Sequence, residues 1–132
     1  MTSPEALNVL VADDDPTLRK LLATLLRRRG YETTEAVDGE QAIEILQSQK
    51  FECGSSKFDL VVLDLMMPKK SGWDVLDFIE NELETLRDHV LVISAAGEDR
   101  LSELEGRGCG VIPKPFGTSD FYGSVERHMR HT

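Results

Sequence analysis

The sequence predicts a single-domain α/β protein, a doubly wound sheet of five parallel strands with helices on both faces. Short apolar runs alternate five times with segments of helical periodicity. The run Leu60–Leu63 is four aliphatic residues between turn signals, which is typical of a strand buried on both faces. This run and others end on polar or charged residues. In an open parallel sheet, ligands bind at the carboxyl ends of the strands, so these residues are the candidates for function.

Length and charge narrow the class of protein. The 132 residues suffice for one domain, with a core over about residues 6–130, and we expect no output domain because only one helix follows Phe116. The 24 acidic and 15 basic residues give a formal charge of −9, which repels phosphate backbones and anionic lipid, so we expect no direct nucleic-acid or membrane partner. Cys53 and Cys109 form no metal or redox motif, and no signal peptide is evident, which favours a cytoplasmic protein.

The first half of the chain predicts two strands and two helices. A strand is expected over residues 7–12, and a helix runs from Pro16 to a stop at Gly30, with Asp15 as N-cap. The leucines of this helix recur at helical spacing and form one apolar face: Leu18, Leu21, Leu22, Leu25 and Leu26. The Thr-rich segment 31–36 predicts a strand near an edge, and a second helix is expected over about 40–49.

The second half repeats the alternation less regularly. We expect the polar connection 50–57 to be mobile. The buried strand over 59–64 precedes a helix over about 73–84, and the strand over 90–93 ends on Ser94. The helix over 99–105 is weak because glycines follow it closely. A short strand at residues 111–112 and a helix from about 119 to 129 complete the chain.

Strand order brings the polar residues together. Right-handed crossovers and helices on both faces are satisfied by the order 2-1-3-4-5 of flavodoxin-like folds. This order puts the first strand beside the third, and so Asp13 and Asp14 beside Asp64. Ser94 and Lys114 follow the fourth and fifth strands at the same edge.

These residue types indicate phosphoryl chemistry. Three crowded carboxylates repel one another unless a cation joins them, and an all-oxygen site completed by water and phosphate suits Mg²⁺. Lys114 and the Ser94 hydroxyl can hold phosphoryl oxygens. An ionised aspartate such as Asp64 can attack phosphorus to give an acyl phosphate.

The chain resembles the receiver domains of two-component response regulators along essentially its whole length. The matching segments are Val9-Leu10-Val11-Ala12-Asp13-Asp14-Asp15-Pro16, Asp64-Leu65-Met66-Met67-Pro68 with Gly72, Ser94-Ala95, and Lys114-Pro115-Phe116. The resemblance implies a phosphoacceptor switch, which promotes only its own phosphorylation and dephosphorylation and is not a turnover enzyme. It also implies a histidine kinase or phosphotransfer protein as donor, an unidentified downstream protein target, and a possible phosphorylation-dependent homodimer.

The resemblance also assigns a role to each site residue. Asp64 is the phosphoacceptor, and Lys114 and Ser94 clamp the phosphoryl group. Asp14 and Asp64 ligate Mg²⁺ directly, Asp13 does so largely through water, and the Met66 backbone carbonyl is a further ligand. The Lys114–Pro115 bond is often cis in such domains.

Three positions affect how the expected switch would work. Val111 stands where the family usually has an aromatic residue that moves with the hydroxyl at Ser94. Met66 and Ala96 lie at the positions associated with tuning dephosphorylation, and neither can orient water, which predicts a long-lived phosphoryl group.

Three alternative functions stay open. A receiver-like module that signals without phosphorylation is compatible with Val111. A small Mg²⁺-dependent phosphatase with an aspartyl nucleophile would need a second acid where Met66 stands. A flavodoxin-like cofactor binder would need a phosphate-cradling loop where the chain has Asp13, Asp14 and Asp15, which would repel phosphate.

Overall fold

The five strands form one parallel sheet in the predicted order. The structure is a computed structural model that describes residues 7–50, 56–67, 69–94 and 101–130. The sheet order is β2-β1-β3-β4-β5, and every neighbouring pair is parallel. The strands are β1 Asn8–Ala12, β2 Glu32–Ala36, β3 Leu60–Asp64, β4 Val90–Ser94 and β5 Gly110–Pro113. The prediction of an edge position for the Thr-rich strand, β2, is also confirmed.

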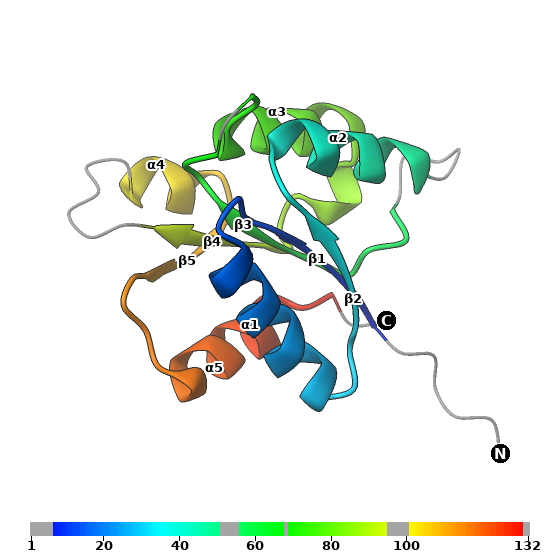
Figure 1. Cartoon of the computed structure of the whole chain (residues 1–132). Helices are drawn as coiled ribbons and strands as arrows, with labels where there is room; N and C mark the ends of the chain where they lie inside the picture. Colours follow the sequence, from blue (N-terminus) through cyan, green and yellow to red (C-terminus); the bar gives the residue numbers. More distant parts are fainter. Residues whose placement is uncertain (1–6, 51–55, 68, 95–100, 131–132) are drawn as a thin grey trace, which may run out of the picture.

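Helices cover both faces of the sheet. The helices are α1 Pro16–Arg28, α2 Gly39–Ser48, α3 Gly72–Glu82, α4 Leu101–Gly106 and α5 Thr118–His128, with a short 3-10 helix η1 at Glu84–Leu86. Figure 1 shows α2, α3 and α4 above the sheet and α1 and α5 below it. The doubly wound α/β fold predicted from the sequence is therefore confirmed. Among the helices of the described segments, none has both the length and the apolar character needed to span a bilayer.

Side-chain caps set most helix starts. The Asp15 carboxylate accepts a hydrogen bond from the Thr17 N–H, as predicted for the N-cap of α1. The Asp38 carboxylate accepts from the Gln41 N–H, so α2 begins at Gly39, one residue before the predicted start. Helix α3 ends at Glu82 instead of Glu84, because the chain tightens into η1 after Leu83.

The sheet separates two hydrophobic cores. Alternate residues of the strands point to opposite faces, so Leu10 and Val61 pack under α2 and α3, while Val9 and Val62 pack against α1 and α5. Every residue of β3 is buried, which confirms the prediction that this strand is covered on both faces. The strand that ends on Asp64 is thus the centre of both cores.

Two predicted segments lie partly outside the described residues. These are the connection 50–57, of which residues 51–55 are not described, and the start of the fourth helix before residue 101. An isolated antiparallel bridge joins Lys50 to Ser56 at the two described ends of the connection. Within α4, Leu104 is fully buried and joins the α2 and α3 core.

Candidate functional site

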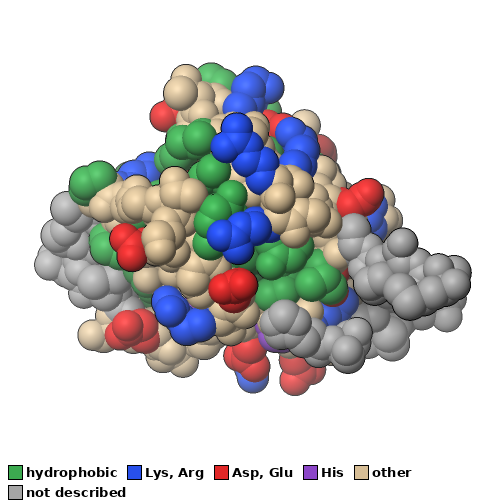
Figure 2. All heavy atoms as spheres, turned by 90° about the horizontal axis from the view of Figure 1, so that it is seen from below, with side chains coloured by type: hydrophobic (Ala, Val, Ile, Leu, Met, Phe, Trp, Pro, Cys, Tyr) green, Lys and Arg blue, Asp and Glu red, His purple; other side chains and the backbone are tan. Residues whose placement is uncertain are grey.

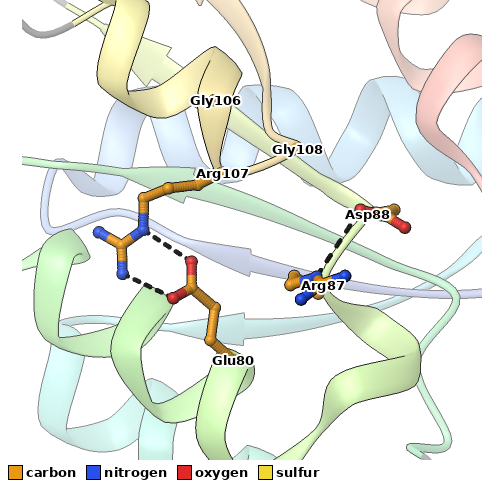
Figure 3. A pocket seen from close by; sticks show the side chains of 6 residues that line it. All are labelled: Glu80, Arg87, Asp88, Gly106, Arg107 and Gly108. Carbon is orange, nitrogen blue, oxygen red and sulfur yellow. Dashed lines mark hydrogen bonds and ion pairs between the residues drawn. The ribbon is translucent and has the colours of Figure 1, made fainter.

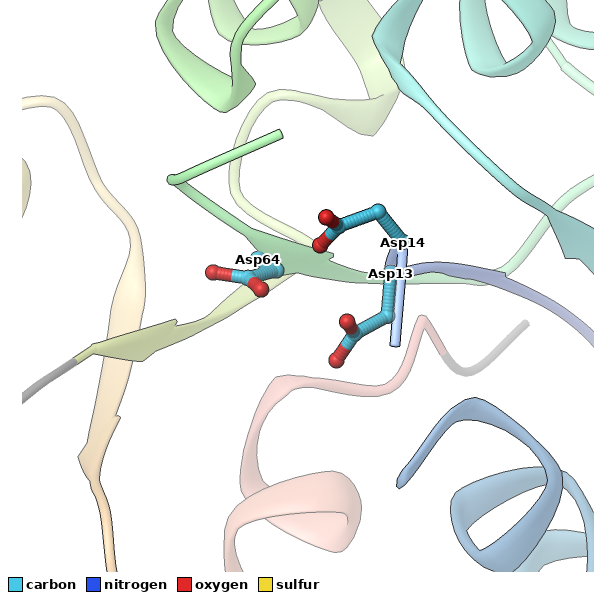
Figure 4. A group of neighbouring side chains, drawn as sticks. All are labelled: Asp13, Asp14 and Asp64. Atoms are coloured by element: carbon cyan, nitrogen blue, oxygen red, sulfur yellow. The ribbon is translucent and has the colours of Figure 1, made fainter. Parts of the chain in front are cut away.

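Three carboxylates meet at the carboxyl edge of the sheet, at the ends of β1 and β3 (Figure 4). Ala12 pairs in register with Leu63, so the next residues, Asp13 and Asp64, are neighbours. Asp13, Asp14 and Asp64 each offer a carboxylate oxygen, and these oxygens lie within 4.8 Å of one another. The clustering predicted from strand order is therefore present.

Asp13 is buried, and one of its two carboxylate oxygens has no hydrogen-bond partner among the described residues. Its Oδ1 accepts a hydrogen bond of 2.9 Å from the Asp15 N–H. Its Oδ2 is buried and has no hydrogen-bond partner among the described residues. Burial, with a further contribution from the Asp64 charge, raises the pKa of Asp13 from 3.8 to about 6. Such an oxygen calls for a proton or a cation.

Asp64 lies between a backbone donor and a lysine. Its Oδ1 accepts a hydrogen bond of 3.1 Å from the Met66 N–H, and its Oδ2 lies 3.8 Å from the Lys114 Nζ. Lys114 directly follows β5, and its peptide bond to Pro115 is cis, as the resemblance implies. One cation therefore reaches the carboxylate cluster from the fifth strand.

The carboxylates border a hollow that is open to solvent. Its volume is about 260 Å³, and it is lined by Asp14, Asp15, Asp64, Leu65, Met66, Ile93 and Lys114. The three carboxylates offer only oxygen ligands: Asp14 and Asp64 line the hollow, while Asp13 Oδ2 is buried without a partner among the described residues. A hard divalent cation with a partial water shell fits this donor set.

The other predicted site residues are placed as follows. Ser94 is the last residue of β4, one position beyond Ile93, which pairs with Asp64; the Ser94 hydroxyl and Ala96 lie outside what the structure describes. The Met66 side chain is 74% exposed. Val111 is half-buried in β5 and packs against the core under α2 and α3.

Two further residues touch the site: Gly72, which the resemblance includes without assigning it a role, and Arg19, which sequence reasoning missed. Gly72, the first residue of α3, packs so closely that an added Cβ would lie 2.6 Å from the Asp64 carbonyl oxygen. Arg19 on α1 donates a hydrogen bond of 3.0 Å to the Asp13 carbonyl oxygen. A glycine carries no hydrophobic signal, so the sequence pattern alone does not indicate the close packing at Gly72. Arg19 follows Leu18 on an amphipathic helix, where a charged residue is usually solvated.

A second hollow, of about 380 Å³, lies between α3, the turn after η1 and the end of α4 (Figure 3). The Arg107 Nε donates a hydrogen bond of 2.6 Å to a Glu80 carboxylate oxygen, and its Nη2 contacts both Glu80 and Asp77. The Arg107 cation is already neutralised by these acids. Here it ties the end of α4 to α3 and leaves little capacity for a ligand.

A third hollow is an apolar groove on the face formed by α1 and α5. Its volume is about 310 Å³. The lining residues are Leu18, Leu21, Leu22, Leu25, Lys114, Pro115, Phe116, Gly117, Thr118 and Phe121. Figure 2 shows hydrophobic side chains beside lysine and arginine on this face. Because Lys114 lines both the groove and the carboxylate hollow, the two are neighbours.

Comparison with protein families identifies the class. The family model of the response regulator receiver domain matches residues 9–126. The chain belongs to this family: it is a receiver domain of a two-component response regulator, a class of signalling switches. The fold and the acidic cluster agree with this assignment.

Curated relatives are regulators of about twice its length. It is 34% identical over 128 residues to the probable transcriptional regulatory protein TcrX of Mycobacterium tuberculosis, covering 97% of this chain and 52% of that protein. It is 33% identical over 126 residues to the transcriptional regulatory protein CpxR of Escherichia coli, covering 94% and 50%. The chain thus spans about half the length of the curated relatives it matches.

Solved structures share the fold. The signal receiver domain of a putative Luxo repressor protein from Vibrio parahaemolyticus matches with a TM-score of 0.79 and 28% identity, over 94% of this chain and 90% of that one. The chemotaxis protein CheY4 of Vibrio cholerae matches with a TM-score of 0.78 over 95% and 100%, and at 22% identity it supports the fold alone.

Proposed function

We propose that this receiver accepts a phosphoryl group on Asp64 in the presence of Mg²⁺. The observation that carries the proposal is the position of the Asp64 carboxylate, with Lys114 Nζ 3.8 Å from one oxygen and the Asp13 and Asp14 carboxylates within 4.8 Å. A nucleophilic carboxylate, a cation and a group of metal-binding oxygens are the parts that phosphoryl transfer requires, because the reaction depends mainly on positioning and charge neutralisation.

Each residue has a distinct part in the proposed reaction. Asp13, Asp14, Asp64 and the Met66 backbone carbonyl would hold Mg²⁺, which would neutralise charge on the carboxylates and the phosphoryl oxygens. An Asp64 oxygen forms a bond to phosphorus while the bond from phosphorus to the donor breaks, and the donor leaves with the electron pair. The Lys114 ammonium and the Ser94 hydroxyl hold the transferred phosphoryl oxygens.

The donor is proposed to be a histidine kinase or a phosphotransfer protein, or a small phosphodonor in its absence. A protein donor needs a docking surface next to Asp64, and the apolar groove that shares Lys114 with the carboxylate hollow is the surface proposed for it. The phosphoryl group adds about 1.5 to 2 negative charges, and the resulting shift at Ser94 and β5 would change the surface offered to a downstream protein or a second copy. The buried free thiol of Cys109 is compatible with the cytoplasm, where we place this chemistry.

Intact-mass measurement tests the proposal directly. The protein is incubated with acetyl phosphate and Mg²⁺, beside an EDTA control, an Asp64→Asn variant and an Asp120→Asn variant that removes an exposed carboxylate of α5. Wild type and Asp120→Asn should gain one phosphoryl group, whereas Asp64→Asn and the EDTA sample should gain none. A phosphoryl adduct that persists in Asp64→Asn would refute the assignment of the acceptor.

A second candidate is a receiver that signals without phosphate. Val111, half-buried against the core where the family usually has a moving aromatic residue, favours it. No mass adduct in wild type, together with normal Mg²⁺ binding, would support this candidate over the first.

A further inference from the structure

We propose that Arg19 is a positioning residue that fixes the peptide between Asp13 and Asp14 and thereby sets the geometry of the metal site. The inference rests on the proposed function for the role of Mg²⁺. Its structural part, the fixed peptide, stands on the contacts of Arg19 alone.

Arg19 is buried, although it is a charged residue on a surface helix. Only 8% of the residue is exposed. Its Nη1 donates a hydrogen bond of 3.0 Å to the Asp13 carbonyl oxygen, and its Nε donates one of 2.9 Å to Glu35 Oε1. Arginine is rarely buried without such partners, because the desolvation of its charge must be compensated. The guanidinium is therefore held in place at the end of β1.

The Asp13 backbone is restrained on both sides by β2. Its N–H donates to the Ala36 carbonyl oxygen at 3.1 Å, and its carbonyl oxygen accepts from Arg19, which is itself bonded to Glu35. The Asp13 carbonyl belongs to the same planar peptide unit as the Asp14 N–H. Fixing that carbonyl therefore restrains the Asp14 backbone, from which the exposed Asp14 side chain reaches the hollow.

The positive charge of Arg19 is offset by a neighbouring carboxylate, that of Glu35. Glu35 pairs with the Arg19 Nε and also accepts a longer contact of 3.4 Å from Arg27. An uncompensated buried cation this close would oppose the binding of a divalent cation. Because the Glu35 carboxylate lies next to the guanidinium and offsets part of its charge, the contribution of Arg19 to the site is mainly geometric.

Three variants separate positioning from charge and from general stability. Arg19→Leu removes the hydrogen bonds and the charge but keeps an apolar stem. Arg19→Lys keeps the cation but loses the planar fork that reaches two acceptors. Arg27→Leu is the matched control, because Arg27 shares Glu35 but is more than half exposed, at 54% of its side chain.

NMR on the full chain supplies two readouts. A Mg²⁺ titration followed by the amide shifts of Asp14 and Leu65 gives the dissociation constant, and ¹⁵N relaxation of the metal-free protein gives the order of the Asp14 amide. We expect Arg19→Leu to weaken Mg²⁺ binding by about tenfold, the lower end of what the loss of a supporting contact costs a metal site. The Asp14 order parameter should fall in the same variant. Arg19→Lys should lie between it and wild type, and Arg27→Leu should match wild type.

The outcomes distinguish this inference from the proposed function. If Arg19→Leu folds and keeps both the wild-type dissociation constant and the wild-type order of Asp14, the inference is overturned; equal weakening in Arg27→Leu would overturn it as well. If Arg19→Leu fails to fold, the comparison of Arg19→Lys with Arg27→Leu decides by the same readouts. If wild type binds no Mg²⁺, the proposed function fails, and the metal-free order of Asp14 alone decides the role of Arg19.

Discussion

Met66 contributes to the site through its backbone, while its side chain faces solvent. The Met66 N–H bonds to Asp64 Oδ1, and the side chain is 74% exposed at the rim of the hollow. A thioether at that rim cannot hold a water molecule in line with the phosphorus of an acyl phosphate. We therefore expect Met66→Asn, alone or with Ala96→Glu, to speed the loss of the phosphoryl group several-fold. The decay of the phosphorylated mass, followed in Mg²⁺ after acetyl phosphate has been removed by desalting, measures this rate. Met66→Leu is the control, and an unchanged rate in Met66→Asn would contradict the prediction.

The buried thiol of Cys109 should make the protein less stable at alkaline pH. Burial raises the pKa of its thiol from 9.0 to about 11. The folded protein holds the neutral thiol, so this contribution to stability is complete below pH 9 and is lost as the pH rises from 9 towards 11. At pH 10 the loss is about 1 kcal/mol, since one pKa unit corresponds to about 1.4 kcal/mol.

Urea unfolding at pH 8 and pH 10 tests this prediction, with Cys109→Ala compared with wild type. The variant loses packing at both pH values, but its further loss between them should be smaller than that of wild type by the amount given above. Equal losses in the two proteins would show that Cys109 does not titrate as described.

At the scale of elements, α3 begins so close to β3 that only glycine fits. A Cβ on Gly72 would lie 2.6 Å from the Asp64 carbonyl oxygen and from Leu65 Cα, and the Gly72 N–H donates to the Leu65 carbonyl at 2.9 Å. Gly72→Ala must therefore displace the end of β3, at a cost of about 1–3 kcal/mol in stability. Phosphorylation by acetyl phosphate should slow as well, because Asp64 moves with its backbone.

Gly106→Ala is the matched control for Gly72→Ala. Gly106 ends α4, and a Cβ there would meet nothing within 4 Å. This change should leave the phosphorylation rate unaltered and leave stability equal or slightly higher. Comparable slowing of phosphorylation in both variants would mean that the close approach of α3 to β3 does not position Asp64.

If the apolar groove between α1 and α5 is where a protein phosphodonor docks, a change in the groove should impair phosphotransfer from a protein but not from a small molecule. Leu21 lines this groove and is 52% exposed in the free protein. Leu21→Asp should reduce phosphotransfer from any histidine kinase found to phosphorylate the wild type, and it should not affect acetyl phosphate, which needs no docking surface. Gln47→Asp, an exposed change on α2 at the opposite face, is the control. Equal loss with both donors would place the defect in the site or the fold instead of in docking.

The elements themselves were largely predictable from sequence, and the exceptions have physical reasons. Apolar runs, the cap at Asp15 and the right-handed crossovers predicted five strands in the observed order. The predicted boundaries of α2 and α3 were displaced by one or two residues, because Asp38 caps the helix through its side chain and Leu83 turns into η1. Periodicity detects apolar faces and does not report such local hydrogen bonds.

At the scale of the whole molecule, the carboxyl ends and the amino ends of the strands have different roles. The carboxyl edge gathers the acidic residues at the ends of β1 and β3. The opposite edge is fastened by Arg130, whose guanidinium binds Asp59 at 3.0 Å and the Ser56 carbonyl oxygen at 3.1 Å. The acidic cluster followed from sequence because strand order alone brings it together. The Arg19 and Arg130 contacts did not, since each pairs residues through side-chain geometry that no spacing encodes.

If Mg²⁺ binds at the acidic edge as proposed, the stability of the whole molecule should depend on it. The fold raises the pKa of Asp13 to about 6, which means that the folded protein tolerates the ionised carboxylate less well than the unfolded chain does. At pH 7.5 the carboxylate is ionised in both states and destabilises the metal-free protein by about 2–3 kcal/mol. Asp13→Asn cannot ionise, and its stability in EDTA at pH 7.5 should exceed that of wild type by about 1–2 kcal/mol. Mg²⁺ should reverse the order, since binding at about 100 times its dissociation constant adds about 2.7 kcal/mol to wild type and less to the variant.

Urea unfolding in EDTA and in saturating Mg²⁺ measures both differences. Repeating the EDTA series at pH 5 provides an internal check: the stabilisation from a raised pKa is present at low pH and lost as the pH rises through 6, so the advantage of Asp13→Asn should shrink there. Asp120→Asn, which removes an exposed charge, should show neither the advantage nor the reversal. If Asp13→Asn is less stable than wild type in EDTA at pH 7.5, the buried carboxylate is not a strain that the metal relieves. The acidic edge would then be a structural feature of the fold.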